Sequence, residues 1–275
     1  MPFEKRELWC ERTRSTGDRV RLYGEVYLPL GCEAKDAAGS PAAAAAPSPL
    51  PLPTVILTHP FAADHTFMRP YAELLAECGF AAYAFDFFGG GLVTKSDGTL
   101  LDMSVETEVA DLEAVIDLMR AQPFCDAGRL FLMGASQGGF VASVTANRHP
   151  ELARALVLLY PAYVLHDDAL ALFPEGTEIP ETYEMMGITV GARYGRDARA
   201  LDPFDEMGRF GGNVLIMHGD ADKIAALAYS ERAARTFAHA ELKVMPDAGH
   251  CFQDDALVRS AQLAKRFLAR EAGLR

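Results

Sequence analysis

The chain has 275 residues, half of them hydrophobic, which is enough for one sizeable core or a domain with a small insertion. Its net charge of −12 opposes binding to nucleic acids and to anionic membrane surfaces. The five cysteines are scattered and form no C-x-x-C pair, and the sequence shows neither an apolar signal segment nor a run of about 18 apolar residues. We therefore expect a soluble cytoplasmic protein with free thiols, and no nucleic-acid or membrane partner.

The N-terminal part predicts a hairpin followed by an irregular insertion. Residues 3–12 and 19–29 read as two strands, with rough alternation of apolar and polar side chains in the second. A Pro/Ala-rich stretch follows at about 33–53, and its proline density rules out a stable helix. The stretch could be a ligand for a proline-binding module, but a flexible surface loop that the fold tolerates is the favoured interpretation.

From residue 54 onward, predicted strands and helices alternate. The strands are expected at 54–58, 81–85, 129–133, 155–159, 214–217 and 242–246, and the helices near 67–78, 104–122, 140–148 and 257–270. This alternation predicts an α/β fold, with a mostly parallel central sheet and helices on both faces. In the helix at 104–122, apolar residues spaced by three or four predict the buried face, and we expect its acids, Glu108 and Asp111 among them, to face water.

Residues 163–206 break this alternation. The segment lies between two predicted sheet strands, contains several prolines and glycines, and is too long for an ordinary connection. We interpret it as a small inserted cap that supplies a pocket and limits the access of water; a surface excursion without contact to the site is the alternative. The whole chain, 1–275, is expected to form a single domain that carries this cap and the Pro/Ala-rich loop.

A serine in a glycine-flanked turn is the first candidate for chemistry. Gly134-x-Ser136-x-Gly138 follows an apolar strand pattern and precedes a helical one, which is the context of a nucleophile elbow. A serine hydroxyl needs a base, and the base needs an orienting group. Asp222 and His250 each follow a predicted strand, in the chain order Ser, Asp, His, so we predict Ser136 as nucleophile, His250 as general base and acid, and Asp222 as the orienting group.

Two neighbouring residues compete with these assignments. Asp220 could replace Asp222, or it could close the turn through a bond from its side chain to the backbone. His218 could replace His250 as the base, but it lies on the same loop as both acids, and a structural role is favoured.

The expected oxyanion hole consists of two backbone N–H groups, one on Gln137 and one on Phe61. Pro60 precedes Phe61 and cannot donate, but it fixes its own φ and biases His59 to an extended conformation. It could hold the Phe61 N–H in place, or it could only end the strand. We expect neither a metal nor a cofactor, and Gly89–Gly91 does not fit a phosphate-binding pattern.

Residues 54–270 resemble the α/β-hydrolase superfamily, and within it bacterial cinnamoyl (feruloyl) esterases. The similar segments are the elbow at 134–139, the loop at 84–91 and the motif at 248–254. The oxyanion segment His-Gly-Phe of that family appears here as His59-Pro60-Phe61, which departs at the middle position. Members of the family bind the phenolic ring of hydroxycinnamates in an inserted cap, and by position the acid and the tyrosine that contact ring hydroxyls would be Asp168 and Tyr194.

The residues and the resemblance together predict a serine carboxylic ester hydrolase. It would act through an acyl-enzyme on small aryl or hydroxycinnamoyl esters, with a small-molecule ester as its partner. The alternatives are a thioesterase, peptidase or acyltransferase that uses the same three residues, or a catalytically silent ligand-binding protein. The sequence leaves a homodimer open.

Overall fold

An eight-stranded sheet forms the centre of the computed structural model, which describes residues 2–30 and 51–274. The strand order is β1-β2-β4-β3-β5-β6-β9-β10, and all pairs except β1–β2 and β2–β4 are parallel. The strands are β1 (Phe3–Thr13), β2 (Arg19–Pro29), β3 (Leu52–Thr58), β4 (Ala81–Phe85), β5 (Cys125–Ala135), β6 (Ala155–Leu159), β9 (Asn213–Gly219) and β10 (Ala240–Met245). The predicted α/β fold with a mostly parallel sheet is confirmed, and the first two strands form the predicted hairpin.

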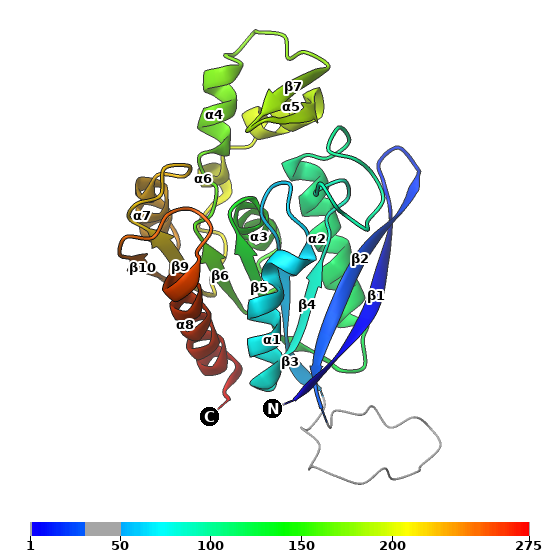
Figure 1. The fold of residues 1–275 in the computed structure, drawn as a ribbon, viewed down its shortest axis with the longest axis vertical. Coiled ribbons are helices and arrows are strands. Elements are labelled where there is room, and N and C mark those ends of the chain that lie inside the picture. Colours follow the sequence, from blue (N-terminus) through cyan, green and yellow to red (C-terminus); the bar gives the residue numbers. More distant parts are fainter. Residues whose placement is uncertain (1, 31–50, 275) are drawn as a thin grey trace.

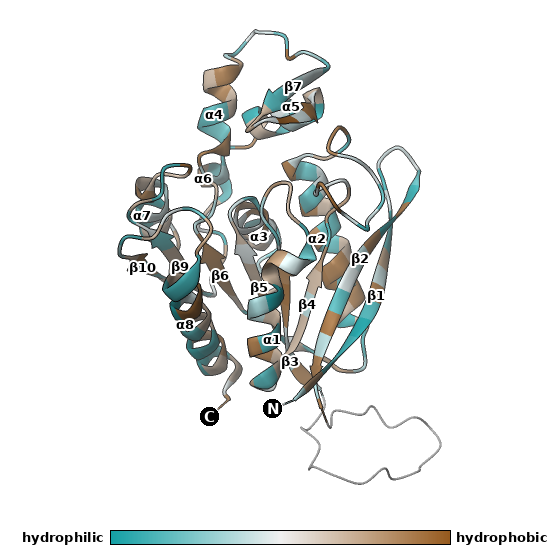
Figure 2. Cartoon of the chain, viewed as in Figure 1, coloured by the Kyte–Doolittle hydropathy of each residue, from teal (hydrophilic) through white to brown (hydrophobic). Residues whose placement is uncertain are grey.

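Helices cover both faces of this sheet (Figure 1). The helices α1 (Arg69–Glu77) and α8 (Asp254–Ala272) pack on one face, and α2 (Val105–Arg120), α3 (Gln137–Arg148) and α7 (Leu227–Thr236) pack on the other. Successive strand residues serve the two cores in turn: Val55 and Leu57 face one, and Ile56 faces the other. Strands buried on both faces read as unbroken apolar runs, which Figure 2 shows for the central strands.

The segment between β6 and β9 folds into smaller elements above the carboxyl edge of the sheet (Figure 1). It contains α4 (Leu165–Leu172), the hairpin β7 (Thr182–Met185) and β8 (Ile188–Gly191), α5 (Ala192–Ala200) and α6 (Pro203–Glu206). We call residues 163–206 the cap segment. A short 3₁₀ helix, His65–Met68, lies between β3 and α1 in the chain. No helix among the described residues is long and apolar enough to span a membrane.

The Pro/Ala-rich loop predicted at about 33–53 falls largely outside the described residues. Its last part was assigned wrongly, because β3 already begins at Leu52. Pro53 lies at a register shift between Leu52 and Thr54 in the pairing of β3 with β5. A proline is tolerated at such an irregularity, where its missing N–H breaks no regular ladder bond.

Candidate active site

Ser136 occupies the sharp turn between β5 and α3. Its φ of 53° is in the left-handed region, which a non-glycine residue rarely adopts. The two flanking glycines are required by close approach: a Cβ at Gly134 would lie 2.3 Å from the carbonyl oxygen of Gly138, and one at Gly138 would lie 2.5 Å from that of His59. The predicted strand–turn–helix geometry is therefore present at Ser136.

The structure brings the three residues predicted for catalysis into one hydrogen-bonded row. His250 Nε2 lies 2.8 Å from Ser136 Oγ, and His250 Nδ1 lies 2.7 Å from Asp222 Oδ2. The ring of Tyr160 meets the imidazole edge-on at 4.8 Å between centroids and supports its orientation. Because one ring nitrogen faces the carboxylate, the other is set to exchange a proton with the serine hydroxyl.

The surroundings of Asp222 keep its carboxyl group in the ionised form. Burial by itself would raise the pKa of this carboxyl, but hydrogen bonds from His218, His250 and the backbone N–H groups of Ala225 and Ile224 outweigh it and hold the pKa well below its usual range. A carboxylate that stays charged at neutral pH can orient a neutral imidazole and stabilise the imidazolium that forms during catalysis.

The two competing residues take structural positions. Asp220 Oδ1 accepts a hydrogen bond from the backbone N–H of Asp247 at 2.7 Å, which ties the loop after β9 to the loop after β10. His218 is fully buried, with Nδ1 2.7 Å from Ser230 Oγ and Nε2 2.8 Å from the carbonyl oxygen of Ala225. Neither residue is hydrogen-bonded to the serine hydroxyl, so the geometry favours Asp222 and His250 over both.

The predicted oxyanion hole would use the backbone N–H groups of Phe61 and Gln137. Phe61 and Gln137 line the same cavity as Ser136. Within the described part of the chain, neither of their N–H groups donates a hydrogen bond to another group. For Gln137 this follows from its place in the first turn of α3, where backbone N–H groups have no partner in the helix.

His59 fixes the peptide unit that carries the Phe61 N–H. Burial lowers the pKa of His59, so the ring is neutral at pH 7. Its Nε2 accepts from the N–H of Phe87 at 3.2 Å, which leaves the proton on Nδ1, and Nδ1 donates to the carbonyl oxygen of Pro60 at 2.7 Å. In a trans peptide the carbonyl and the following N–H point in opposite directions, so this bond turns the Phe61 N–H away from His59.

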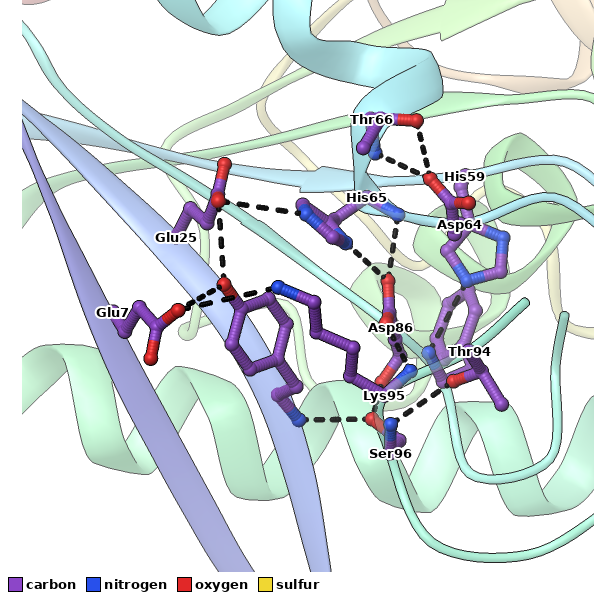
Figure 3. A network of polar contacts seen from close by, with 12 residues as sticks. Glu7, Glu25, His59, Asp64, His65, Thr66, Asp86, Thr94, Lys95 and Ser96 are labelled. Atoms are coloured by element: carbon purple, nitrogen blue, oxygen red, sulfur yellow. Dashed lines mark hydrogen bonds and ion pairs between the residues drawn. The ribbon is translucent and has the colours of Figure 1, made fainter.

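A buried polar network holds the loop that supplies the Phe87 N–H (Figure 3). Asp86 Oδ1 accepts from the backbone N–H and from Nδ1 of His65, at 2.7 and 2.6 Å, and Asp86 Oδ2 accepts from the N–H of Lys95 at 2.8 Å. On its other side, His65 Nε2 lies 3.7 Å from Glu25 Oε1. The network connects β2, the turn before α1 and the loop after β4.

Three side chains of this network come close enough to be considered as metal ligands. Asp64, His65 and Asp86 place ligand atoms within 4.8 Å of one another. However, Asp86 already accepts the bonds described above, and Asp64 Oδ1 caps the following turn by accepting from Thr66 N–H at 2.8 Å. The hydrogen bonds account for these groups as parts of the fold.

A cavity of about 370 Å³ opens beside Ser136. The cap segment provides most of its wall, and the lining is mainly apolar and aromatic. The rim carries exposed apolar side chains, including Leu172 and Met186. The size and the lining are typical of a site for a small organic molecule.

Asp168 and Tyr194, predicted to contact the substrate, both line this cavity, but their polar groups differ in availability. Tyr194 is buried and its hydroxyl donates to Gln137 Oε1 at 2.5 Å. The carboxyl of Asp168 makes no hydrogen bond to the described residues, and partial burial, with Asp167 beside it, raises its pKa. The hydroxyl of Tyr194 is therefore already used inside the protein, whereas the carboxyl of Asp168 is free.

One residue behind the cavity, Glu108, was predicted wrongly from the sequence. Glu108, expected to face water, is 1% exposed, and its Oε2 accepts from Gln137 Nε2 at 2.8 Å; Asp111 is fully buried as well. The spacing could have revealed this, because position 108 lies three residues after Val105 and four before Leu112, on the apolar stripe of α2.

The fold is that of several solved proteins. Est1E from Butyrivibrio proteoclasticus with bound ferulic acid aligns with a TM-score of 0.79 at 22% identity, over 92% of this chain and 96% of Est1E. The alpha/beta hydrolase GrgF from Penicillium sp. sh18 aligns with a TM-score of 0.71 at 14% identity, over 98% and 100%. A monoacylglycerol lipase from Paleococcus ferrophilus aligns with a TM-score of 0.63 at 19% identity, over 98% and 100%. At identities this low the alignments establish the fold alone. The similarity of fold confirms the predicted α/β-hydrolase architecture.

A comparison with curated protein sequences gives no significant match. The family assignment comes from a sequence profile that covers most of the chain and includes all three residues of the Ser136–His250–Asp222 row. Since the profile of the prolyl oligopeptidase family matches residues 66–275, the chain belongs to that family.

Proposed function

We propose that this chain, a serine hydrolase by fold and family, cleaves carboxylic esters through an acyl-enzyme. The observation that carries the proposal is the row in which His250 is hydrogen-bonded to Ser136 on one side and to Asp222 on the other. A side chain that is placed between a hydroxyl and a carboxylate in this way can accept the hydroxyl proton and later return it.

The proposed reaction uses only groups of this chain, the ester and water. Ser136 Oγ attacks the ester carbonyl while His250 Nε2 takes its proton, and the oxyanion accepts hydrogen bonds from the N–H groups of Gln137 and Phe61. The tetrahedral intermediate then expels the alcohol, which receives the proton from His250. Water attacks the acyl-enzyme with His250 again as base, and the acid leaves as Ser136 regains its proton.

The proposed substrates are small aryl or hydroxycinnamoyl esters. The apolar and aromatic cavity beside Ser136 suits a flat ring, and the free carboxyl of Asp168 can accept a hydrogen bond from a ring hydroxyl. The likeness in fold to a protein solved with ferulic acid supports the same choice.

A peptidase is the second candidate, because the family to which the chain belongs is named for oligopeptide cleavage. The same three residues can cleave an amide, and the chemistry of the leaving group separates the two functions. Turnover of a prolyl p-nitroanilide that exceeds turnover of aryl esters in kcat/KM would favour the peptidase.

The first test combines covalent labelling with two ester assays. The protein is incubated with a fluorophosphonate probe, and hydrolysis of p-nitrophenyl acetate is compared with hydrolysis of methyl ferulate. We expect labelling of Ser136 and turnover of both esters, and neither in Ser136→Ala. Turnover of the acetate alone would keep the esterase and reject the phenolic substrate, whereas absence of labelling and turnover would reject the proposed function.

A further inference from the structure

Three buried polar side chains form a continuous hydrogen-bonded chain behind the serine. The hydroxyl of Tyr194 donates to Gln137 Oε1 at 2.5 Å, and Gln137 Nε2 donates to Glu108 Oε2 at 2.8 Å. The exposed fractions of the three residues are only 1% for Glu108, 1% for Gln137 and 2% for Tyr194. Both ends of the Gln137 amide are thus bonded, and because all three side chains are buried, an unmade bond would be costly.

The chain connects the cap segment with the helix layer of the sheet. Tyr194 belongs to α5 of the cap segment, Gln137 is the first residue of α3, and Glu108 belongs to α2. A second hydrogen bond joins α2 and α5 directly. Ser104 Oγ, at the start of α2, donates to Asp197 Oδ2 of α5 at 2.5 Å. α5 cannot move away from α2 and α3 without breaking both contacts.

Glu108 suits the position of a neutral acceptor. Burial raises the pKa of its carboxyl well above the ordinary value, and the hydrogen bond from Gln137 offsets only part of this. A neutral carboxyl still accepts a bond from an amide N–H, and it avoids the cost of a buried charge without a cation beside it. Its other oxygen lies against the backbone of Gly90, where an added Cβ would come within 3.4 Å of Glu108 Oε1.

We propose that Tyr194 and Glu108 are positioning residues for the oxyanion hole. They immobilise the side chain of Gln137, and through it the backbone N–H at the same residue, so the cap segment and the oxyanion donor form one hydrogen-bonded unit. The inference rests on the proposed esterase function, and it gives Tyr194 a role other than contact with a ring hydroxyl. An N–H that is held in place before the reaction stabilises an oxyanion without reorganisation during it.

Tyr194→Phe separates the two roles of the tyrosine. If the hydroxyl positions Gln137, kcat should fall by about 10-fold, the equivalent of one hydrogen bond, for p-nitrophenyl acetate, methyl cinnamate and methyl ferulate alike, with KM little changed. If it contacts ring hydroxyls, only methyl ferulate should be affected, mainly in KM, and the acetate should react as in the wild type. That second result would overturn the inference.

Tyr163→Phe is the matched control. Tyr163 is buried and packs on Phe140 of the same helix α3, with ring centroids 6.4 Å apart, and its hydroxyl is not bonded to Gln137. We expect this variant to keep the wild-type kcat on all three esters. An equal fall in both variants would assign the effect to packing and contradict the inference.

Glu108 is tested by a pair of variants. Glu108→Ala removes the acceptor and should lower kcat by about 10-fold, whereas Glu108→Gln keeps a neutral acceptor of the same size and should restore kcat to within about threefold of the wild type. Wild-type kcat in both Glu108→Ala and Tyr194→Phe would reject the inference while leaving the esterase intact. A wild-type protein with neither labelling nor turnover would instead reject the proposed function, and the inference with it.

Discussion

Two histidine–aspartate pairs in this molecule have nearly the same geometry and different surroundings. His250 Nδ1 lies 2.7 Å from Asp222, and His65 Nδ1 lies 2.6 Å from Asp86. In both pairs the carboxylate also accepts backbone N–H bonds. The pairs differ at the second ring nitrogen, which faces the hydroxyl of Ser136 in the first and the carboxylate of Glu25 in the second (Figure 3).

The third group therefore decides what each pair can do. Ser136 offers a proton and a nucleophilic oxygen beside an open cavity, so the first pair can drive acyl transfer. Glu25 is an acceptor without a proton to give: burial alone would raise its pKa, but hydrogen bonds from Tyr27 and Lys5, together with His65, outweigh burial and lower it. An imidazole between two carboxylates joins β2, the turn before α1 and the loop after β4.

Replacing the third group of the first pair should give the largest effect. Ser136→Ala removes the nucleophile, and we expect ester turnover to fall by on the order of 10⁵–10⁶-fold. The free energy of unfolding should stay within about 1 kcal/mol of the wild type, since only one hydroxyl is lost. Steady-state kinetics and urea denaturation measure the two quantities. Substantial ester turnover in this variant would show that another residue is the nucleophile.

Asp222→Asn should give the next largest effect. The amide cannot stabilise the imidazolium and favours the wrong ring tautomer, so kcat should fall by on the order of 10⁴-fold. Asp220→Asn is the matched control on the same loop, and its kcat should stay within about threefold, because Asp220 bonds to the backbone of Asp247 and not to His250. A larger loss in the Asp220 variant would transfer the orienting role to that residue.

Glu25→Gln should have the opposite profile from Ser136→Ala. It weakens the contacts of Glu25 with Lys5, Tyr27 and His65, and we expect the free energy of unfolding to fall by about 1–3 kcal/mol. Ester turnover at 25 °C should remain that of the wild type, because Glu25 lies on β2, outside the cavity. A loss of turnover without a loss of stability would show that the second pair takes part in catalysis.

The stability difference between the wild type and Glu25→Gln should depend on pH. Since the pKa of Glu25 is lowered by folding, its contribution to stability is present above its unfolded pKa of about 4.3 and is lost as the pH falls through the folded value. The stability gap between wild type and Glu25→Gln should therefore narrow below about pH 4. The difference between the two proteins is the informative quantity, because burial raises the pKa of Asp111 to about 6 and contributes with the opposite sign. A gap that does not depend on pH would contradict this account.

The hydrogen-bonded row of Ser136, His250 and Asp222 could be predicted from the sequence because each residue is marked by a local pattern. A glycine-flanked serine between a strand and a helix, and an acid and a histidine in loops after parallel strands, need only the sheet topology to bring them to one edge. The Tyr194–Gln137–Glu108 chain has no such pattern, because it depends on how the cap segment returns over α3. Counting only apolar residues on α2 also hid Glu108 among the acids expected to face water.

The hairpin of the cap segment shows a second reason for a missed element. Its strands β7 and β8 have only four residues each, so their alternation of polar and apolar side chains is too short to identify a hairpin by itself. The turn between them is Met186-Gly187, with φ of 50° and 77°. Asparagine or aspartate before glycine would have signalled a turn with two positive φ values, and methionine does not.

Asp168→Asn should have the smallest effect and bears on the substrate. If the free carboxyl of Asp168 accepts a bond from a ring hydroxyl, the variant should raise KM for methyl ferulate by about 3- to 10-fold, because an amide is a weaker acceptor. KM for methyl cinnamate, which lacks ring hydroxyls, should change by less than about twofold. Asp167→Asn is the matched control: its carboxylate bonds to Tyr229 and is not part of the cavity wall. Equal changes in KM for both esters would show that Asp168 shapes the pocket without binding a ring hydroxyl. The proposed preference for hydroxycinnamoyl esters would then have no residue that recognises the ring hydroxyl.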